Sequence, residues 1–196
     1  MRIEMLVDAI EDAIKKKCFL PALAMTLVLP DICAKYDYPE IYYGNKKEGK
    51  GIGAAYKKWY NENILPTEKP NYEKSDMSLE TREVFQDLAD KTTLTGRHLW
   101  KLRCGFLHEG AVDLDKEMGD KDNDVHFKLI ATRFSDFEYT LGGISGASKC
   151  GNTYEIDVDI VQLCGKILAV LKHSYINNPD FIEKTDMKKI NYEERL

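Results

Sequence analysis

Residues 20–35 are apolar on nearly every side of a helix, and this segment restricts the fold more than any other. A helix that is apolar all round has to be surrounded by other elements, whereas a surface helix carries one apolar stripe. Pro21 suits the first helical turn, where a missing N–H costs nothing. Pro30 interrupts the hydrogen bonding, so we expect a kink or an end at Pro30 and Asp31. The segment therefore predicts the central helix of a bundle.

Apolar residues recur at helical spacing in much of the remaining chain. The pattern predicts helices at 2–16, 52–64, 79–89 and 94–108, and a final helix that begins at Asp159. A chain of 196 residues with 43% hydrophobic content is long enough for one buried domain and short for two. We therefore predict a mainly α fold, a bundle of four to five long helices in a single domain over residues 1–178. Residues 179–196 read as a polar C-terminal tail, with Phe181 as a docking point.

The region from 113 to 158 has a different character. Residues 113–124 hold six Asp or Glu and lack the ligand spacing of a calcium-binding loop, which favours a solvated loop over a cation site. Residues 125–134 and 153–158 alternate and are partly β-branched, as half-buried strands are, and 142–151 is rich in turn residues. We predict a small antiparallel β-hairpin insertion near residues 125–158.

Arg103 and His108 are the residue types that phosphodiester cleavage needs. An arginine pairs with phosphate oxygens as a permanently charged fork, and a histidine can give or take a proton near neutral pH. Arg103 falls within the apolar face made by Leu99, Leu102 and Phe106, where an unpaired charge would cost several kcal/mol. It therefore needs a carboxylate, water or a partner surface. If the spacing is fortuitous, Arg103 pairs with a structural carboxylate and His108 simply favours the helix end.

The geometry of an ideal helix separates the two residues. His108 would lie about 140° around the helix from Arg103 and roughly 7.5 Å along it. The two residues therefore need not touch within one chain. Two copies packed about a two-fold axis would bring them together, so the pattern favours a composite site in a homodimer.

Five other residues are supporting candidates for this site: Asp31, Cys104, Glu109, Tyr56 and Lys57. Asp31 either pairs with Arg103 or orients His108, or else it caps a helix that restarts after the proline. Tyr56 and Lys57 either form the rim of a cleft or belong to the core and to a solvated face.

The stretch Leu94–Gly110, with Pro30–Cys33 and Tyr56–Tyr60 upstream, resembles a family of small bacterial and phage proteins and, through them, the HEPN superfamily. The resemblance implies a helical dimer that cleaves RNA without metal through an Arg-x4-6-His motif, here Arg103 and His108. In many active members the residue after the arginine is Asn, Asp or His, whereas this chain has Cys104. That departure favours the alternative, a catalytically inactive HEPN-like dimer that binds RNA or a neutralising protein partner in a toxin–antitoxin or phage-defence role.

Composition narrows the partners. The net charge of −5 argues against binding nucleic acid over a general basic surface, so any RNA contact should be local. Lysine and arginine clusters at 15–17, 46–50, 57–58 and 97–103 are either solvated faces or the edges of a cleft.

Other signals point to the cytoplasm and to no cofactor. The five cysteines form no CxxC pair, which is typical of a reducing compartment, and the near-continuous apolar run of about twelve residues from Cys18 is too short to span a bilayer. His98, His126 and His173 lack zinc-ligand spacing, and residues 44–51 lack the Ser or Thr of a phosphate-binding P-loop. We expect no metal, no cofactor and no membrane association.

Overall fold

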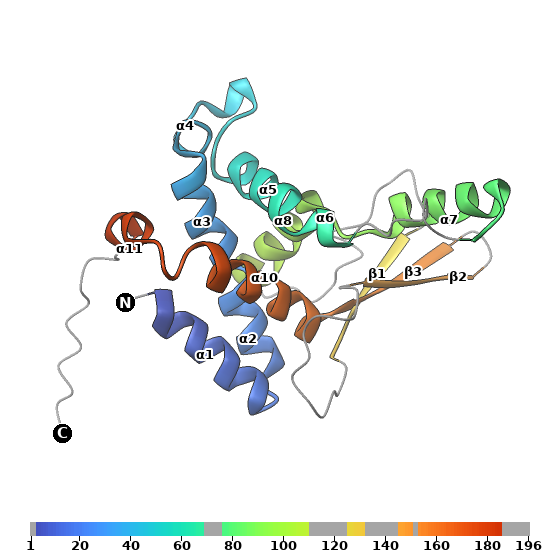
Figure 1. Ribbon diagram of the computed structural model, residues 1–196, viewed down its shortest axis with the longest axis horizontal. Coiled ribbons are helices and arrows are strands. Elements are labelled where there is room, and N and C mark those ends of the chain that lie inside the picture. The colour runs from blue at the N-terminus through green and yellow to red at the C-terminus, as the bar shows by residue number, and fades with distance from the viewer. Residues whose placement is uncertain (1–2, 69–75, 110–124, 132–144, 151–152, 186–196) are drawn as a thin grey trace.

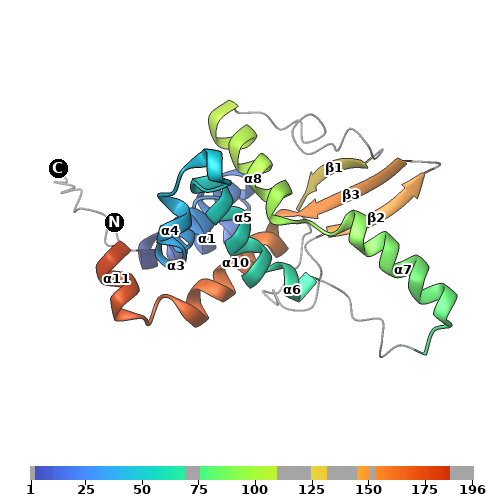
Figure 2. The ribbon, with the colours of Figure 1, turned by 90° about the horizontal axis from the view of Figure 1, so that it is seen from above.

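The computed structural model describes residues 3–68, 76–109, 125–131, 145–150 and 153–185. Helices from both ends of the chain pack into one bundle, and a small sheet and helix α7 extend from one side of it (Figures 1 and 2). The predicted mainly helical class is confirmed. The acidic segment 113–124, residues 132–134 and the tail from 186 onward lie outside the described residues.

The chain begins with six helices and a short 3-10 turn: α1 (Ile3–Lys15), α2 (Phe19–Thr26), α3 (Leu29–Asp37), α4 (Pro39–Tyr42), η1 (Lys46–Glu48), α5 (Ile52–Asn63) and α6 (Leu65–Glu68). Two helices and a π-helical turn follow: α7 (Leu79–Thr92), α8 (Gly96–Cys104) and η3 (Gly105–Glu109). The rest comprises β1 (Val125–Ile130), β2 (Ser145–Cys150), β3 (Thr153–Asp159), α10 (Ile160–Ser174) and α11 (Pro179–Thr185).

The central apolar segment forms two helices, α2 and α3, with a break at Leu27 and Val28. Pro30 has no N–H to donate to the carbonyl of Thr26, so the α-helical hydrogen bonding is interrupted here. At the break the N–H of Val28 bonds to the carbonyl of Met25, three residues back, at 3.2 Å. The helical stretch 19–37 is longer than the apolar run seen in the sequence. By length and composition alone its 19 residues would be able to cross a membrane, a criterion that buried core helices also meet. Here Leu23 and Leu27 are fully buried in the bundle core.

The core is built from the inward faces of α1, α2, α3, α5, α8 and α10 together with β3. Its largest fully buried side chains include three aromatics of α5, which are Trp59, Tyr56 and Tyr60. The indole N–H of Trp59 donates to the hydroxyl of Tyr175 at 2.7 Å, and that hydroxyl donates to Asp37. The core therefore contains a satisfied polar chain that joins α3, α5 and the end of α10.

The β-insertion is a mixed sheet, so the prediction that its two alternating segments pair as an antiparallel hairpin is wrong. The two segments with alternating patterns, β1 and β3, pair in parallel, with Val125 opposite Tyr154. β2 pairs antiparallel with the other edge of β3, in a stretch that the sequence predicted as turn-rich. Alternation shows which side chains share a face and carries no information on strand direction. β3 runs directly into α10, where Asp159 caps the helix by accepting from the N–H groups of Val161 and Gln162.

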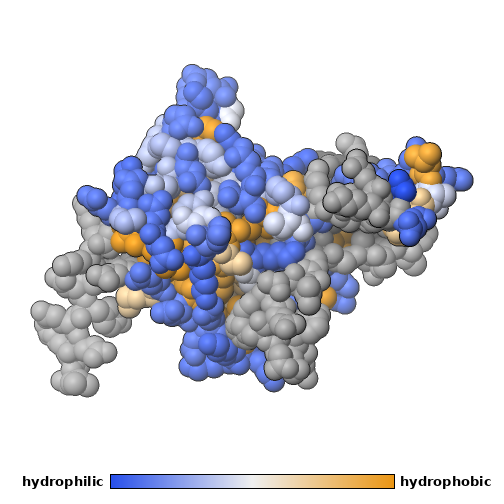
Figure 3. All heavy atoms as spheres, viewed as in Figure 1, coloured by the Kyte–Doolittle hydropathy of each residue, from blue (hydrophilic) through white to orange (hydrophobic). Residues whose placement is uncertain are grey.

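Two peripheral helices complete the fold. α7 extends away from the bundle, and Figure 3 shows apolar atoms exposed at its outer end. Leu79, Val84 and Phe85 of this helix are exposed. α11 packs on α3, with the rings of Tyr36 and Phe181 edge to face at 5.1 Å. Phe181 is fully buried, so this residue does dock the beginning of the C-terminal segment.

Candidate active site

The helix that carries Arg103 begins in close contact with α5. The N–H of Gly96 donates to Oδ1 of Asn61 at 2.8 Å. A Cβ at this position would lie 2.3 Å from the backbone oxygen of Lys57, closer than real Cβ atoms come to backbone. Thr95 precedes the helix as its N-cap, and its N–H donates to Nδ1 of His98 at 3.2 Å. Glycine at 96 therefore fixes where α8 starts and how near it lies to α5.

A π-helical turn brings Arg103 and His108 together within one chain. α8 ends at Cys104, and residues Gly105–Glu109 continue as η3. A π-helix bonds residues five apart, so i and i+5 come onto the same face, whereas an ideal α-helix separates them. Nη1 of Arg103 lies 2.7 Å from Nε2 of His108. The two residues therefore touch within a single chain, where an ideal α-helix would have separated them, and the local change of helix type is the reason.

Besides His108, two residues hold Arg103. Nη2 donates to Oδ2 of Asp31 at 3.0 Å, and the guanidinium carbon lies 5.2 Å from the centre of the Trp100 ring. The side chains of Arg103 and Asp31 are only 16% and 15% exposed. Asp31 therefore supplies the carboxylate that a charge on this apolar face requires.

The contact between Arg103 and His108 defines where the imidazole proton lies. A guanidinium has only donors, so Nε2 of His108 has to be the acceptor in a hydrogen bond between them. This arrangement requires a neutral imidazole with its proton on Nδ1. His108 is exposed, so a substrate can reach it, and its Nε2 lone pair has to be released from Arg103 before the imidazole can act as a general base.

The carboxyl of Asp31 carries two opposing influences. Burial raises its pKa, while the charge of Arg103 and its hydrogen bond act to lower it, and burial is the larger effect. Oδ1 of Asp31 and Nε of Arg103 are buried, and neither has a hydrogen-bond partner among the described residues. The ion pair is thus incompletely satisfied by the described residues, and buried polar atoms without a partner call for an explanation, one of which is a catalytic role.

The raised pKa of Asp31 gives a prediction about stability. The folded chain holds this proton at pH values where the unfolded chain, with an aspartate pKa of about 3.9, has lost it. Ionisation therefore lowers the free energy of unfolding as the pH rises through that window. Asparagine does not titrate, so we expect the stability of the wild type relative to Asp31→Asn to fall between pH 4 and pH 7, measured by urea unfolding at both values. A relative stability that rises instead would mean that the attraction of Arg103 outweighs burial.

The other sequence candidates fall into different places. Tyr56 is fully buried, and its hydroxyl donates to the carbonyl of Leu27 at 3.1 Å, so it is a core residue and not the rim of a cleft. Lys57 is half-buried on α5, and its backbone contacts the start of α8. Cys104 is half-buried next to Arg103. The side chain of Glu109 lies outside the described residues.

Two supporting residues were not singled out from the sequence. Trp100 packs edge to face on Tyr56, with ring centres 5.2 Å apart, and it also contacts the guanidinium of Arg103. A Cβ at Gly53 would lie 2.8 Å from that indole, so this glycine leaves the space that the ring occupies. An aromatic residue one helical turn before the arginine was the available signal.

Within the described parts of the chain, no three His, Cys, Asp or Glu side chains lie together as a metal site requires. Cys18, Cys33, Cys104 and Cys164 are free thiols, and burial raises the pKa of Cys164 to about 12. Comparison of the chain with family models, with curated proteins and with solved structures gave no match. The functional argument therefore depends on the site itself.

Proposed function

We propose that this protein is an endoribonuclease that cleaves RNA without a metal ion, by attack of a 2′-hydroxyl on the neighbouring phosphorus. One observation carries the proposal, the continuous chain of contacts from Asp31 through Arg103 to His108. It combines a fixed positive charge with an exposed, neutral imidazole in one place. Phosphodiester cleavage needs both, since charge develops on the phosphoryl oxygens while a proton leaves the nucleophile.

The proposed reaction uses these residues in order. Nε2 of His108 takes the proton of the 2′-hydroxyl, and the 2′-oxygen forms a bond to phosphorus. The bond to the 5′-oxygen breaks, and that oxygen takes a proton from solvent. The products are a 2′,3′-cyclic phosphate and a 5′-hydroxyl end. A phosphate oxygen that enters the site replaces His108 as the acceptor of the Nη1 hydrogen of Arg103, which frees the imidazole to act as base.

Asp31 has a positioning role in this proposal. Arginine has a long side chain with several rotatable bonds, and catalysis requires the guanidinium to be preorganised where charge develops. The carboxylate fixes one edge of the fork, and the Trp100 ring restricts its face. The remaining edge is directed to His108 and, in the proposed complex, to the phosphate.

The experiment is an assay of the purified protein on tRNA and total RNA with EDTA present. We expect fragments whose 2′,3′-cyclic phosphate ends resist 3′ adapter ligation until end repair, and whose 5′-hydroxyl ends polynucleotide kinase labels directly. Intact RNA after long incubation at high protein concentration would overturn the proposal. Cleavage that disappears only when EDTA is added would overturn its metal-independent mechanism.

The second candidate is a HEPN-like protein that binds RNA or a protein partner and does not cut. The ion pair favours it, because Asp31 already neutralises Arg103 and both side chains are mostly buried. Cys104 after the arginine favours it as well. The same assay distinguishes the two candidates, because the second predicts binding with no new RNA ends. The homodimer stays a prediction, since one chain is sufficient to bring Arg103 and His108 together.

A further inference from the structure

A pocket of about 700 Å³ lies beside the ion pair, between α3, α4 and α11. Its volume is within the range typical of small-molecule sites, about 300–1,000 Å³. Asp31 belongs to its wall and also holds Arg103, so the pocket and the Arg103–His108 pair share a residue. A ligand that fills the pocket therefore reaches Asp31, the residue that holds Arg103.

The wall of the pocket combines aromatic rings with cations. Tyr36, Tyr42 and Tyr43 contribute rings, and Lys35 and Lys184 contribute ammonium groups. Lys35 lies four residues after Asp31, so both occupy the same face of α3. Its Nζ is 5.9 Å from the centre of the Tyr43 ring, and it forms no ion pair with any residue in the described part of the chain.

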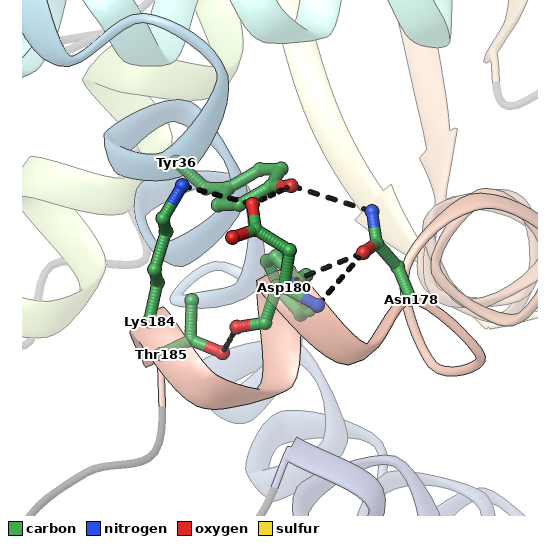
Figure 4. A network of polar contacts seen from close by, with 6 residues as sticks. Tyr36, Asn178, Asp180, Lys184 and Thr185 are labelled. Atoms are coloured by element: carbon green, nitrogen blue, oxygen red, sulfur yellow. Dashed lines mark hydrogen bonds and ion pairs between the residues drawn. The ribbon is translucent and has the colours of Figure 1, made fainter.

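The α11 side of the pocket is fixed by a network of polar contacts (Figure 4). Asp180 accepts from the hydroxyl of Tyr36 at 2.7 Å and from Nζ of Lys184 at 2.9 Å. The amide of Asn178 donates to the same tyrosine oxygen at 3.3 Å. These contacts connect α11 to α3. Because Asp180 already pairs with Lys184, Lys35 is the cation most available to a ligand.

We infer that this pocket binds one nucleotide unit, an aromatic base with its phosphate, and so positions an RNA chain against Arg103 and His108. Each base has a π-face that stacks on tyrosine, and lysine contacts phosphate oxygens without regard to sequence. The placement of the RNA chain rests on the proposed ribonuclease function. The tyrosine rings and the lysine would let a protein with a net charge of −5 hold RNA locally.

The binding experiment uses a fluorescein-labelled 2′-O-methyl oligonucleotide, which lacks the attacking hydroxyl and is not consumed. Fluorescence anisotropy then reports affinity independently of catalysis. Tyr43 is 69% exposed and Lys35 is also exposed, so both can be truncated without opening the core. We expect Tyr43→Ala to weaken binding by about 5- to 150-fold, as loss of one base–aromatic stack does. Lys35→Ala should weaken binding and reduce the salt slope by about one.

Lys58→Ala is the matched control. Nζ of Lys58 lies 4.5 Å over the ring of Tyr38, so this variant also removes a charge from a tyrosine face, but outside the pocket. It should bind like the wild type. The inference is overturned if the wild type does not bind the oligonucleotide, or if Lys35→Ala and Tyr43→Ala bind no more weakly than Lys58→Ala.

Two further measurements are needed. One distinguishes an RNA chain from a free nucleotide as the ligand, and the other distinguishes binding in the pocket from cleavage by Arg103 and His108. Competition with AMP distinguishes an RNA chain from a free nucleotide, and we expect the oligonucleotide to bind at least tenfold more tightly. Binding of AMP as tight as that of the oligonucleotide would overturn the placement of an RNA chain. If pocket variants lose binding while the wild type cuts no RNA, the proposed reaction fails and the nucleotide site stands.

Discussion

His108→Ala is expected to abolish RNA cleavage, lowering the rate by about 10²–10⁴-fold, the usual contribution of a positioned general base or acid. The fold should be unaffected, because the imidazole is exposed and contacts Arg103 at the surface. Removal of His108 leaves the ion pair between Arg103 and Asp31 intact. The variant therefore separates catalysis from stability, and both can be measured on one preparation by cleavage rate and thermal unfolding.

His173→Ala provides the matched control for this prediction. His173 is an exposed histidine near the end of α10, outside both the Asp31–Arg103–His108 chain of contacts and the lining of the pocket. Its removal should leave the cleavage rate unchanged. A His108→Ala variant that cuts as fast as the His173→Ala control would exclude His108 as the general base.

Arg103 is expected to matter as much for the reaction, but its removal also affects the fold. Arg103→Ala leaves the mostly buried Asp31 without its partner, which destabilises. Arg103→Lys keeps the charge and loses the fork that reaches Asp31 and His108 at once, so we expect it to fold and to lose most activity. Because the pair forms in one chain, mixing Arg103→Lys with His108→Ala should not restore cleavage. Restoration would instead support a composite site between two chains.

The predicted fold was most accurate where one face of a helix has a long, regular apolar pattern. The helices α1 and α5 begin and end close to the residues that periodicity and capping indicate, and α10 begins directly after its predicted cap Asp159. The direction of the strands was not accessible, since β1 and β3 have the same pattern whether they pair in parallel or antiparallel. The pairing depends on how the chain returns between them, which residue patterns do not encode.

The candidate site was predictable in its residues but not in its geometry. Arg103, His108 and Asp31 were identified from residue type and position, since a charge on an apolar face requires a partner. The π-turn at Gly105–Glu109 was not predictable, because it changes the hydrogen-bond register without changing the apolar pattern. That local change moves His108 onto the face of Arg103, and it makes a second chain unnecessary for their contact.

The fold itself should depend most on Trp59. Trp59→Ala is expected to lower the free energy of unfolding by about 3–5 kcal/mol, as other truncations of buried tryptophan or phenylalanine do. The indole is fully buried and donates to the hydroxyl of Tyr175, so the variant creates a cavity and also removes a buried hydrogen bond. A loss of this size is a large fraction of the roughly 5–15 kcal/mol that stabilises a typical domain. Urea unfolding followed by circular dichroism measures it.

Tyr60→Phe tests whether packing or hydrogen bonding dominates on the same helix. Tyr60 is fully buried next to Trp59, and its hydroxyl has no hydrogen-bond partner within the described parts of the chain. Removing an unsatisfied polar atom while keeping the ring should be nearly neutral or stabilising. If both side chains lie where the structure places them, Trp59→Ala should lower the free energy of unfolding by several kcal/mol, whereas Tyr60→Phe should leave it unchanged or raise it. Equal destabilisation by Tyr60→Phe would mean that its hydroxyl has a partner, and would place α5 differently against the rest of the bundle.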